Sequence, residues 1–422
     1  MAYAAIGFSY AARTDSKGKM TNVRAGTNAL RLGDYNQQVV LEHIRTAPSV
    51  SRVEIAEHTG LTAQAISKIV RKLVEEGLVL EVGTTASSVR GGRPATELRV
   101  NPEAAYAIGV QIDRDVTTFA LLDLTGAVVD KRRRTTPLSG SRASISQIAT
   151  VINALLASNG ISADDVLGIG VGVPGPLDPD TGIAYSPGGM AGWGTVELAR
   201  LLRERTGFPV TVDNDAVAAA VGESWARQAQ GVRSLLFVYA SWGLGAALLL
   251  DGQVYRGATA ASEFHHVPVD PQGPECECGN RGCVGEYVTP TAVVAEVRRR
   301  TPSRRRESLE RPYQEICQAA LDGKKTEREV LAEAARMLTL GLLGVTNVVP
   351  PDLVVLGGSA IEEAREIYAR EVASGFEQRA EYFRGRGVRV DFSIAGPDVG
   401  AIGAASLVLH STYSPRVTPI RS

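Results

Sequence analysis

Short apolar, strand-like runs alternate with helical segments over most of this 422-residue chain, and no other feature constrains its fold as strongly. The strand-like runs occupy 107–112, 117–124, 166–173, 210–212, 235–240, 246–250 and 353–356, and helical periodicity covers 144–158, 326–347 and 362–381. Strands that alternate with helices form mixed sheets flanked by helices. From position 101 onward we therefore expect an α/β fold with two lobes and a cleft between them.

The first hundred residues follow a different pattern, that of three short helices. Apolar residues at helical spacing predict a helix over 37–45. Ser51 precedes Glu54 by three residues, which is the capping-box arrangement that opens a second helix. Gly60 ends that helix, and Thr62 can cap a third. A helix, a short glycine-containing turn and another helix make the helix-turn-helix pattern of DNA-binding proteins.

The third helix, predicted over 63–76, has one apolar face and one polar face. The apolar face would pack on the first two helices and consists of Ile66, Ile69, Val70, Leu73 and Val74. The polar face carries Gln64, Ser67, Lys68 and Arg71. Amide, hydroxyl and basic side chains hydrogen-bond base edges or phosphates when a helix enters the major groove. We therefore predict that this face, with Thr62 at its start, contacts DNA.

A basic loop follows this helix. Gly77 ends the helix, a strand is expected over 78–82, and the loop after it holds Arg90 and Arg93 in the sequence Arg-Gly-Gly-Arg. Such a loop is typical of the wing of a winged helix-turn-helix, whose arginines contact the DNA backbone or minor groove. The alternative is a small helical bundle with a solvated charged face, because positions 36–99 hold eight Lys/Arg against seven Asp/Glu. The order of caps, polar face and basic loop favours DNA binding.

Composition limits where and how the protein can act. The net charge is −1, so DNA binding must come from a local patch. No run approaches the roughly 20 apolar residues that span a bilayer, and we expect no membrane partner. We expect residues 1–26 to form a disordered tail. The start of the chain lacks the pattern of a signal peptide. Four cysteines in so long a chain do not indicate a disulfide framework, and we expect a cytoplasmic protein.

Three of the four cysteines crowd together as Cys276-x-Cys278-x4-Cys283. This spacing brings three thiolates within reach of one ion, and a closed tetrahedral site needs a fourth ligand. The alternative is a surface loop with three free, oxidisable thiols. The spacing favours a structural metal site, and we expect Zn²⁺ as the ion.

The stretch from Glu263-Phe264-His265-His266 through 276–283 resembles the ROK family (repressors, open reading frames and sugar kinases). The resemblance covers nearly everything from Gly26 onward. It identifies His266 as the zinc histidine that completes the ligand set, within a zinc loop at 263–286.

The resemblance also implies an architecture. It implies a winged helix-turn-helix over 27–100, followed over 101–422 by a two-lobed, actin-like or ribonuclease H-like sugar-kinase fold. The small lobe would span about 101–214 and include a C-terminal helix at 400–413. The large lobe would span about 215–399 and carry the zinc loop.

By the same resemblance the cleft holds a sugar. The sugar-binding residues that it implies are Asn214, Asp215, Glu263, His266 and Glu286. In the family's kinases the aspartate that matches Asp215 is the general base. A carboxylate and an amide side by side suit a polyol, because one accepts two hydroxyl protons and the other both donates and accepts. The alternative for Asn214 and Asp215 is simple capping of the helix that follows.

Three positions near this site depart from the family pattern. His265 stands where a glycine is usual, and Gly189 where an asparagine is usual. Gly285 stands where a glutamate is usual, with Glu286 one place later. These departures leave the identity of the ligand, and its existence, open.

Both phosphate-binding loops of the family's kinases are also altered. The segment Gln111-Ile112-Asp113-Arg114-Asp115 stands where the kinases have Asp-x-Gly-Gly-Thr, and Ser241-Trp242-Gly243 stands where they have Gly-Thr-Gly. Phosphoryl transfer needs close backbone approach and positive charge around the phosphates. Acidic side chains and an indole oppose both requirements, so we expect no enzyme activity and no catalytic residue.

The sequence therefore predicts a transcriptional regulator, and a repressor in particular. It would bind operator DNA as a homodimer or homotetramer and respond to a sugar or sugar derivative in the cleft. One alternative is an active sugar kinase with an appended DNA reader. Another is a DNA-binding regulator that needs no ligand.

Overall fold

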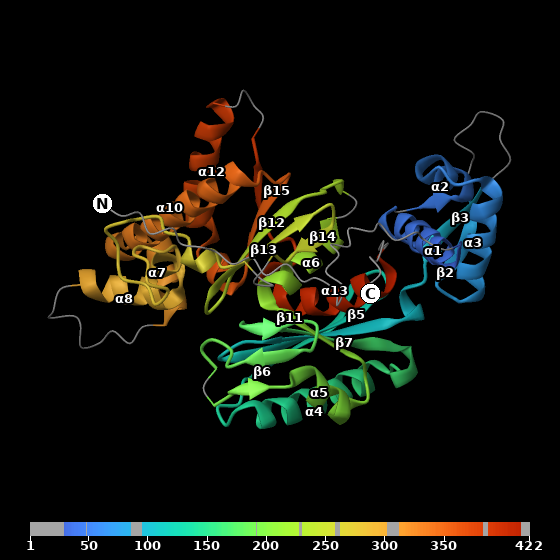
Figure 1. Cartoon of the computed structure of the whole chain (residues 1–422), viewed down its shortest axis with the longest axis horizontal. Coiled ribbons are helices and arrows are strands. Elements are labelled where there is room, and N and C mark those ends of the chain that lie inside the picture. Colours follow the sequence, from blue (N-terminus) through green and yellow to red (C-terminus); the bar gives the residue numbers. More distant parts are fainter. Residues whose placement is uncertain are drawn as a thin grey trace, which may run out of the picture.

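The computed structural model describes residues 29–47, 49–85, 95–190, 192–227, 230–257, 262–301, 312–382 and 387–414. A small N-terminal unit, coloured blue in Figure 1, lies beside two larger α/β lobes. The expected tail at 1–26 and the loop with Arg90 and Arg93 lie outside the described residues. Among the helices within those ranges, none combines the length and apolar character needed to cross a bilayer.

The N-terminal unit, called the reader unit below, spans the described part of 29–100. Its elements are α1 (Ala29–Thr46), β1 (Val50–Ser51), α2 (Arg52–Thr59), α3 (Ala63–Glu75), β2 (Val79–Thr85) and β3 (Ala95–Val100). The capping box at α2 is formed, with the Ser51 backbone N–H donating to Oε2 of Glu54 over 2.8 Å. Gly60 ends α2 in the left-handed region at φ +69°, and Oγ1 of Thr62 accepts from the Ala65 N–H over 3.2 Å. The predicted helix-turn-helix is confirmed.

The first lobe contains a five-stranded sheet. Its strands are β4 (Tyr106–Ile112), β5 (Val116–Asp123), β6 (Val128–Thr135), β7 (Val166–Val173) and β11 (Val210–Asn214), in the order β11-β7-β4-β5-β6. Strands β4, β5 and β6 form an antiparallel meander, while β7 and β11 run parallel to β4. Helices α4 (Ser141–Asn159) and α5 (Leu198–Thr206) contribute to the core on one face. A small sheet of β8 (Leu177–Asp178), β9 (Ile183–Tyr185) and β10 (Thr195–Val196) precedes α5.

The second lobe repeats this arrangement. Its strands are β12 (Leu235–Ala240), β13 (Leu244–Leu250), β14 (Gln253–Tyr255), β15 (Leu353–Gly357) and β16 (Arg389–Phe392), in the order β14-β13-β12-β15-β16. Its helices are α7 (Gly285–Val288), α8 (Pro290–Arg300), α9 (Tyr313–Leu321), α10 (Lys325–Val348), α11 (Ser359–Glu362) and α12 (Arg365–Tyr382). In both sheets a meander of three strands continues into two parallel strands. This duplicated topology is the one expected of a two-lobed sugar-kinase fold, and the predicted fold class is confirmed.

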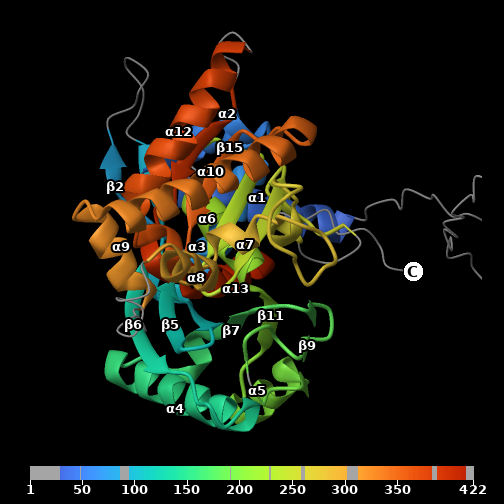
Figure 2. The same ribbon diagram turned by 90° about the vertical axis from the view of Figure 1, so that its left-hand side faces the viewer.

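Two helices fill the space between the sheets, as Figure 2 shows. Helix α6 (Asp215–Arg227) packs on β12 and β13, and α13 (Val399–Tyr413) packs on β4, β5 and β7. The helices also pack on each other at two glycines. A Cβ added to Gly222 would lie 2.5 Å from the Cα of Gly403, so only glycine permits this close approach. Helix α6 therefore packs closely against α13 between the lobes.

The reader unit and the lobes share one hydrophobic core. Ile44 of α1 and Leu98 of β3 belong to the same buried cluster as Trp225 of α6 and Leu409 of α13. On the same boundary the Arg45 guanidinium covers the indole of Trp225, with Cζ 3.9 Å from the ring centroid. Continuous burial across the boundary gives the reader unit a defined position on the two lobes.

Candidate functional site

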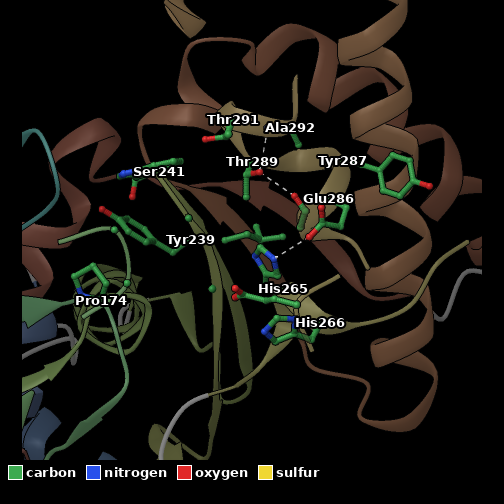
Figure 3. Close-up of a pocket in the computed structure, with 18 of the residues that line it drawn as sticks. Pro174, Tyr239, Ser241, His265, His266, Glu286, Tyr287, Thr289, Thr291 and Ala292 are labelled. Carbon is green, nitrogen blue, oxygen red and sulfur yellow. Dashed lines mark hydrogen bonds and ion pairs between the residues drawn. The ribbon is translucent and has the colours of Figure 1, made fainter. Parts of the chain in front are cut away.

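A cavity of about 1320 Å³ lies between the lobes and extends to the loop before α7. All five effector-binding residues predicted from the sequence line it: Asn214, Asp215, Glu263, His266 and Glu286. The first lobe contributes the turn after β7, and the second contributes the turn between β12 and β13. Figure 3 shows part of its lining, in which His265, His266 and Glu286 lie close together. The cavity is large enough for a sugar, since small-molecule sites commonly enclose about 300–1,000 Å³.

Asn214 and Asp215 stand where β11 ends and α6 begins. Oδ1 of Asn214 and Oδ1 of Asp215 both accept a hydrogen bond from the Ala216 N–H, over 3.0 and 2.9 Å. Both residues therefore cap the helix, and both also line the cavity. Capping occupies one side-chain oxygen of each residue, so capping and ligand contact do not exclude each other.

Negative charge gathers at the inner end of the cavity. Burial and the neighbouring Asp113 carboxylate raise the pKa of Asp215 to about 7. Burial also raises the pKa of Asp113, although a hydrogen bond from Ser241 opposes that shift. Asp213, by contrast, is neutralised by Arg256, whose Nη1 donates to Oδ1 of Asp213 over 3.1 Å. No cation contributes to the raised pKa values of Asp113 and Asp215. This end of the cavity therefore disfavours a further anion.

The His265 imidazole occupies the space beside Gly285. A Cβ built on Gly285 would lie 2.1 Å from Cε1 of His265. Nε2 of His265 is 3.9 Å from Oε1 of Glu286, the contact drawn in Figure 3. The ring also meets the ring of His266 edge-on, with centroids 4.7 Å apart. The two sequence departures at 265 and 285 are therefore in direct contact.

The Trp242 indole makes a similar contact with Gly189. A Cβ built on Gly189 would lie 3.1 Å from Nε1 of Trp242. The indole also contacts Arg114, whose Cζ lies 4.5 Å from the ring centroid. Arg114 comes from the β4–β5 turn of the first lobe and Trp242 from the β12–β13 turn of the second. The two turns at which the sequence predicts altered phosphate loops thus touch each other through Arg114 and Trp242.

His265, Trp242 and Arg114 were not among the site residues predicted from the sequence. The sequence did hold a signal, because Gly285 and Gly189 replace larger residues of the family pattern while His265 and Trp242 replace smaller ones. Only the structure pairs His265 with Gly285 and Trp242 with Gly189, since the members of each pair lie on different segments.

The proposed zinc ligands come together at the loop before α7. Donor atoms of His266, Cys276, Cys278 and Cys283 all lie within 4.8 Å of one another. Nδ1 of His266 is 3.4 Å from Sγ of Cys276, and Sγ of Cys278 is 3.6 Å from Sγ of Cys283. Tetrahedral Zn²⁺ with bonds of roughly 2.0–2.3 Å requires edges of this size. The residues present fit a four-coordinate zinc ion.

The turn between these cysteines depends on glycine. Gly282 has φ +60°, and a Cβ there would lie 1.8 Å from the carbonyl oxygen of Asp270. Gly279 has φ +89° and donates its N–H to the Cys276 carbonyl over 3.0 Å. Burial raises the pKa of Cys283 to about 12. A metal ion at this place would compensate the cost of burying thiolate charge, because it pairs directly with the sulfur.

The polar face of α3 is open to solvent. Gln64, Ser67, Lys68, Arg71 and the capping residue Thr62 are all exposed. The opposite face is buried through Ile66, Val70 and Leu73, and the two further predicted positions, Ile69 and Val74, pack against the same cluster. The structure thus presents the predicted DNA-contacting side chains on one exposed helical face, beside the β2–β3 hairpin.

Two family models match the chain. The ROK family model matches residues 107–411, and a MarR family model matches residues 35–91. The second match covers most of the reader unit, including all three helices from position 35 onward.

Curated proteins that resemble the chain include xylose repressors and an N-acetylglucosamine repressor of Escherichia coli O6:H1. The xylose repressor of Bacillus subtilis (strain 168) is 28% identical over 375 residues, covering 89% of this chain and 94% of that protein. The DNA-binding transcriptional dual regulator NagC of Escherichia coli (strain K12) is 28% identical over 390 residues, covering 88% and 92%.

Solved structures show the same architecture. A ROK family transcriptional regulator, described as a homolog of the E. coli MLC protein, superposes with a TM-score of 0.74 at 25% identity, covering 91% of this chain and 97% of that one. A ROK family glucokinase from Streptomyces griseus, solved with glucose and AMPPNP, gives a TM-score of 0.61 at 25% identity, covering 72% and 99%. The glucokinase match therefore covers less of this chain than the match to the transcriptional regulator.

Proposed function

The chain belongs to the ROK family, and we propose that it is a transcriptional repressor whose affinity for operator DNA is set by a sugar or sugar derivative. The observation that carries this proposal is the path of α6. The helix begins with Asp215 in the cavity, and near its other end Trp225 lies beneath Arg45 of the reader unit. One rigid helix therefore touches both the ligand site and the DNA reader.

DNA binding would use the exposed face of α3. Gln64, Ser67 and Lys68 lie toward its N-terminal half and Arg71 follows one turn later. In helix-turn-helix proteins such side chains enter the major groove, and paired subunits place two helices about 34 Å apart on the duplex. We therefore infer a homodimer or homotetramer that reads a pseudo-palindromic operator, with Arg90 and Arg93 added from the wing.

Sugar binding would use the polar side chains of the cavity. Asn214 offers an amide, and Glu263 and Glu286 offer carboxylates, from opposite sides of the cavity. The names of the matched relatives, a xylose repressor and an N-acetylglucosamine repressor, support a sugar as the ligand class. The acidic pair Asp113–Asp215 favours an unphosphorylated sugar, because it would repel a phosphate.

Signal transfer would follow from closure of the lobes around the sugar. Asp215 and Trp225 are ten residues apart on α6, which is about 15 Å of helix. A shift of α6 that improves the sugar contacts would move Trp225 against Arg45. Coupling of this kind needs different affinities in two states, typically about 1–3 kcal/mol.

Kinase chemistry is absent in this proposal. The contact of Arg114 with Trp242 supports this, because the family resemblance implies that a kinase would have glycine-rich phosphate loops at these two turns. Asp113 adds a carboxylate whose negative charge opposes nucleotide binding. One observation favours the alternative of retained activity, namely that Asp215 has a pKa of about 7, suited to a general base.

Zn²⁺, when bound by His266 and the three cysteines, would supply a four-coordinate cross-link without an open position for catalysis. Nδ1 of His266 faces Cys276, while the same side chain lines the cavity. The loop would therefore hold His266, and its neighbour His265, in place for the ligand.

The experiment uses the full-length protein. Selection from a double-stranded DNA library with a random core supplies the operator, and titration then measures affinity with and without xylose, glucose, N-acetylglucosamine and their phosphates. We expect one selected sequence class and a change of about tenfold in affinity with one unphosphorylated sugar. Failure to select any sequence contradicts DNA reading. An unchanged affinity with every sugar supports the ligand-independent alternative, and ATP-dependent phosphorylation of a sugar supports the kinase.

A further inference from the structure

Gly285 and His265 form a complementary pair in the wall of the effector cavity. Both residues line the cavity, yet they come from different segments, η4 (Phe264–His266) and the start of α7. Three ring atoms of His265 lie within 2.3 Å of the position that a Cβ on Gly285 would take. Contacts this short do not occur. The imidazole can therefore occupy this position only because residue 285 has no side chain.

Two neighbouring side chains contact the ring. Nε2 of His265 faces Oε1 of Glu286 at 3.9 Å, and the ring plane is tilted by 64° to that of His266. Its side chain is 27% exposed, and the exposed part opens into the cavity. The imidazole therefore lies between the Glu286 carboxylate and the His266 imidazole in the cavity wall (Figure 3).

We propose that His265 is a specificity-determining residue of the effector site, and that it meets an acceptor oxygen of the sugar, such as a ring oxygen or an acyl carbonyl. This proposal rests on the proposed function. An imidazole carries at least one N–H donor in either protonation state, whereas a carboxylate carries none. A cavity with His265 packed against Gly285 thus presents a further N–H donor close to the carboxylates Glu263 and Glu286.

The packing part of the proposal is tested without any ligand. Gly285→Ala in the full-length protein should lower the melting temperature by about 2–4 °C, because the added methyl group collides with the imidazole. The same change in a His265→Gly background should cost almost nothing, since the ring is gone. Gly243→Ala is the matched control, because Gly243 also lines the cavity and a Cβ there meets nothing within 4 Å. An equal cost of Gly285→Ala in both backgrounds overturns the pairing.

The specificity part is tested by calorimetric titration with xylose, glucose and N-acetylglucosamine. His265→Gln keeps an N–H donor and should bind the preferred sugar within about threefold of wild type. His265→Glu offers only acceptors and should weaken that sugar by roughly tenfold or more. Equal zinc content in all variants shows that the effect does not arise from loss of the metal loop.

The outcomes separate this proposal from the function on which it rests. If the wild-type protein binds a sugar and His265→Glu binds all three sugars with unchanged affinities, His265 has no role in specificity and the proposed function stands. If the wild-type protein binds none of the sugars, this proposal and the effector part of the proposed function fall together, while selection of an operator still supports DNA binding.

Discussion

The guanidinium of Arg45 lies over the indole of Trp225, with Cζ 3.9 Å from the ring centroid. Arg45 belongs to α1 of the reader unit, and Trp225 belongs to α6, which starts in the effector cavity. Arg45 is held in this position by Glu42, which accepts from its Nε and Nη2 over 3.0 and 2.9 Å. The stack is a specific contact between the two functional halves of the protein.

Arg45→Ala should therefore uncouple the halves. A cation–π contact of this kind is worth about 0.5–2 kcal/mol, so its loss should remove a large part of a coupling energy of similar size. We expect operator binding to persist while the sugar-induced change in affinity falls severalfold, as measured by fluorescence anisotropy with labelled operator.

A matched stack exists elsewhere in the second lobe. Cζ of Arg365 lies 4.6 Å from the ring centroid of Phe392, and Nη1 of Arg365 donates to Oε2 of Glu362 over 3.2 Å. Arg45 likewise lies over an aromatic ring and donates to a glutamate three residues earlier. Arg365→Ala should leave the sugar response as it is in the wild type. Equal losses in both variants would mean that the response depends on general stability and not on the contact at Trp225.

Arg71→Ala tests the DNA-reading face. Its side chain is exposed on α3, and removal of one phosphate or base contact should weaken operator binding by about tenfold. Lys72→Ala is the control on the same helix, because Nζ of Lys72 donates to Gln37 over 2.7 Å and lies 3.7 Å from Glu76. Electrophoretic mobility shifts measure both variants. A larger loss of operator affinity for Lys72→Ala than for Arg71→Ala would mean that a different face of α3 contacts DNA.

Cys278→Ser tests the metal site. Loss of one of four ligands should reduce bound zinc, measured by mass spectrometry of the protein, from about one ion per chain to a small fraction. The melting temperature should fall with it, because the loop before α7 loses its cross-link. Cys317→Ala is the control, since Cys317 is buried in α9 and outside the metal cluster. Purified wild-type protein without zinc, and with undiminished stability, would contradict the structural role.

Asp215→Asn tests the charge in the cavity. The folded protein raises the pKa of Asp215 from 3.8 to about 7, so the folded state holds a proton that the unfolded state releases between these values. Wild-type stability should therefore decline as the pH rises from about 4 to about 7 through this group. The asparagine variant lacks this decline and should melt at a higher temperature than wild type at pH 8. Near pH 4 the two proteins should converge, and a constant difference across the range would exclude Asp215 as the cause.

Much of the architecture could be predicted from local pattern. The caps Ser51 and Thr62 and the helix stop at Gly60 act over three or four residues, so the sequence around them contains the whole physical cause. The same holds for the buried strands β4, β7, β12 and β15, whose apolar runs are continuous because both faces are covered. Strand β6 was missed, since residues 130–134 are charged and it lies at the sheet edge, where the pattern is weak.

The sequence by itself determined which chemical groups the protein has: a polar helix face, a Cys/His set, and the polar pair Asn214-Asp215. Only the tertiary structure decided which of them meet. It placed His265 over Gly285 and Arg45 over Trp225, contacts between segments 20 and 180 residues apart along the chain. No local rule predicts such pairs, because they depend on how two lobes and a reader unit pack around α6 and α13.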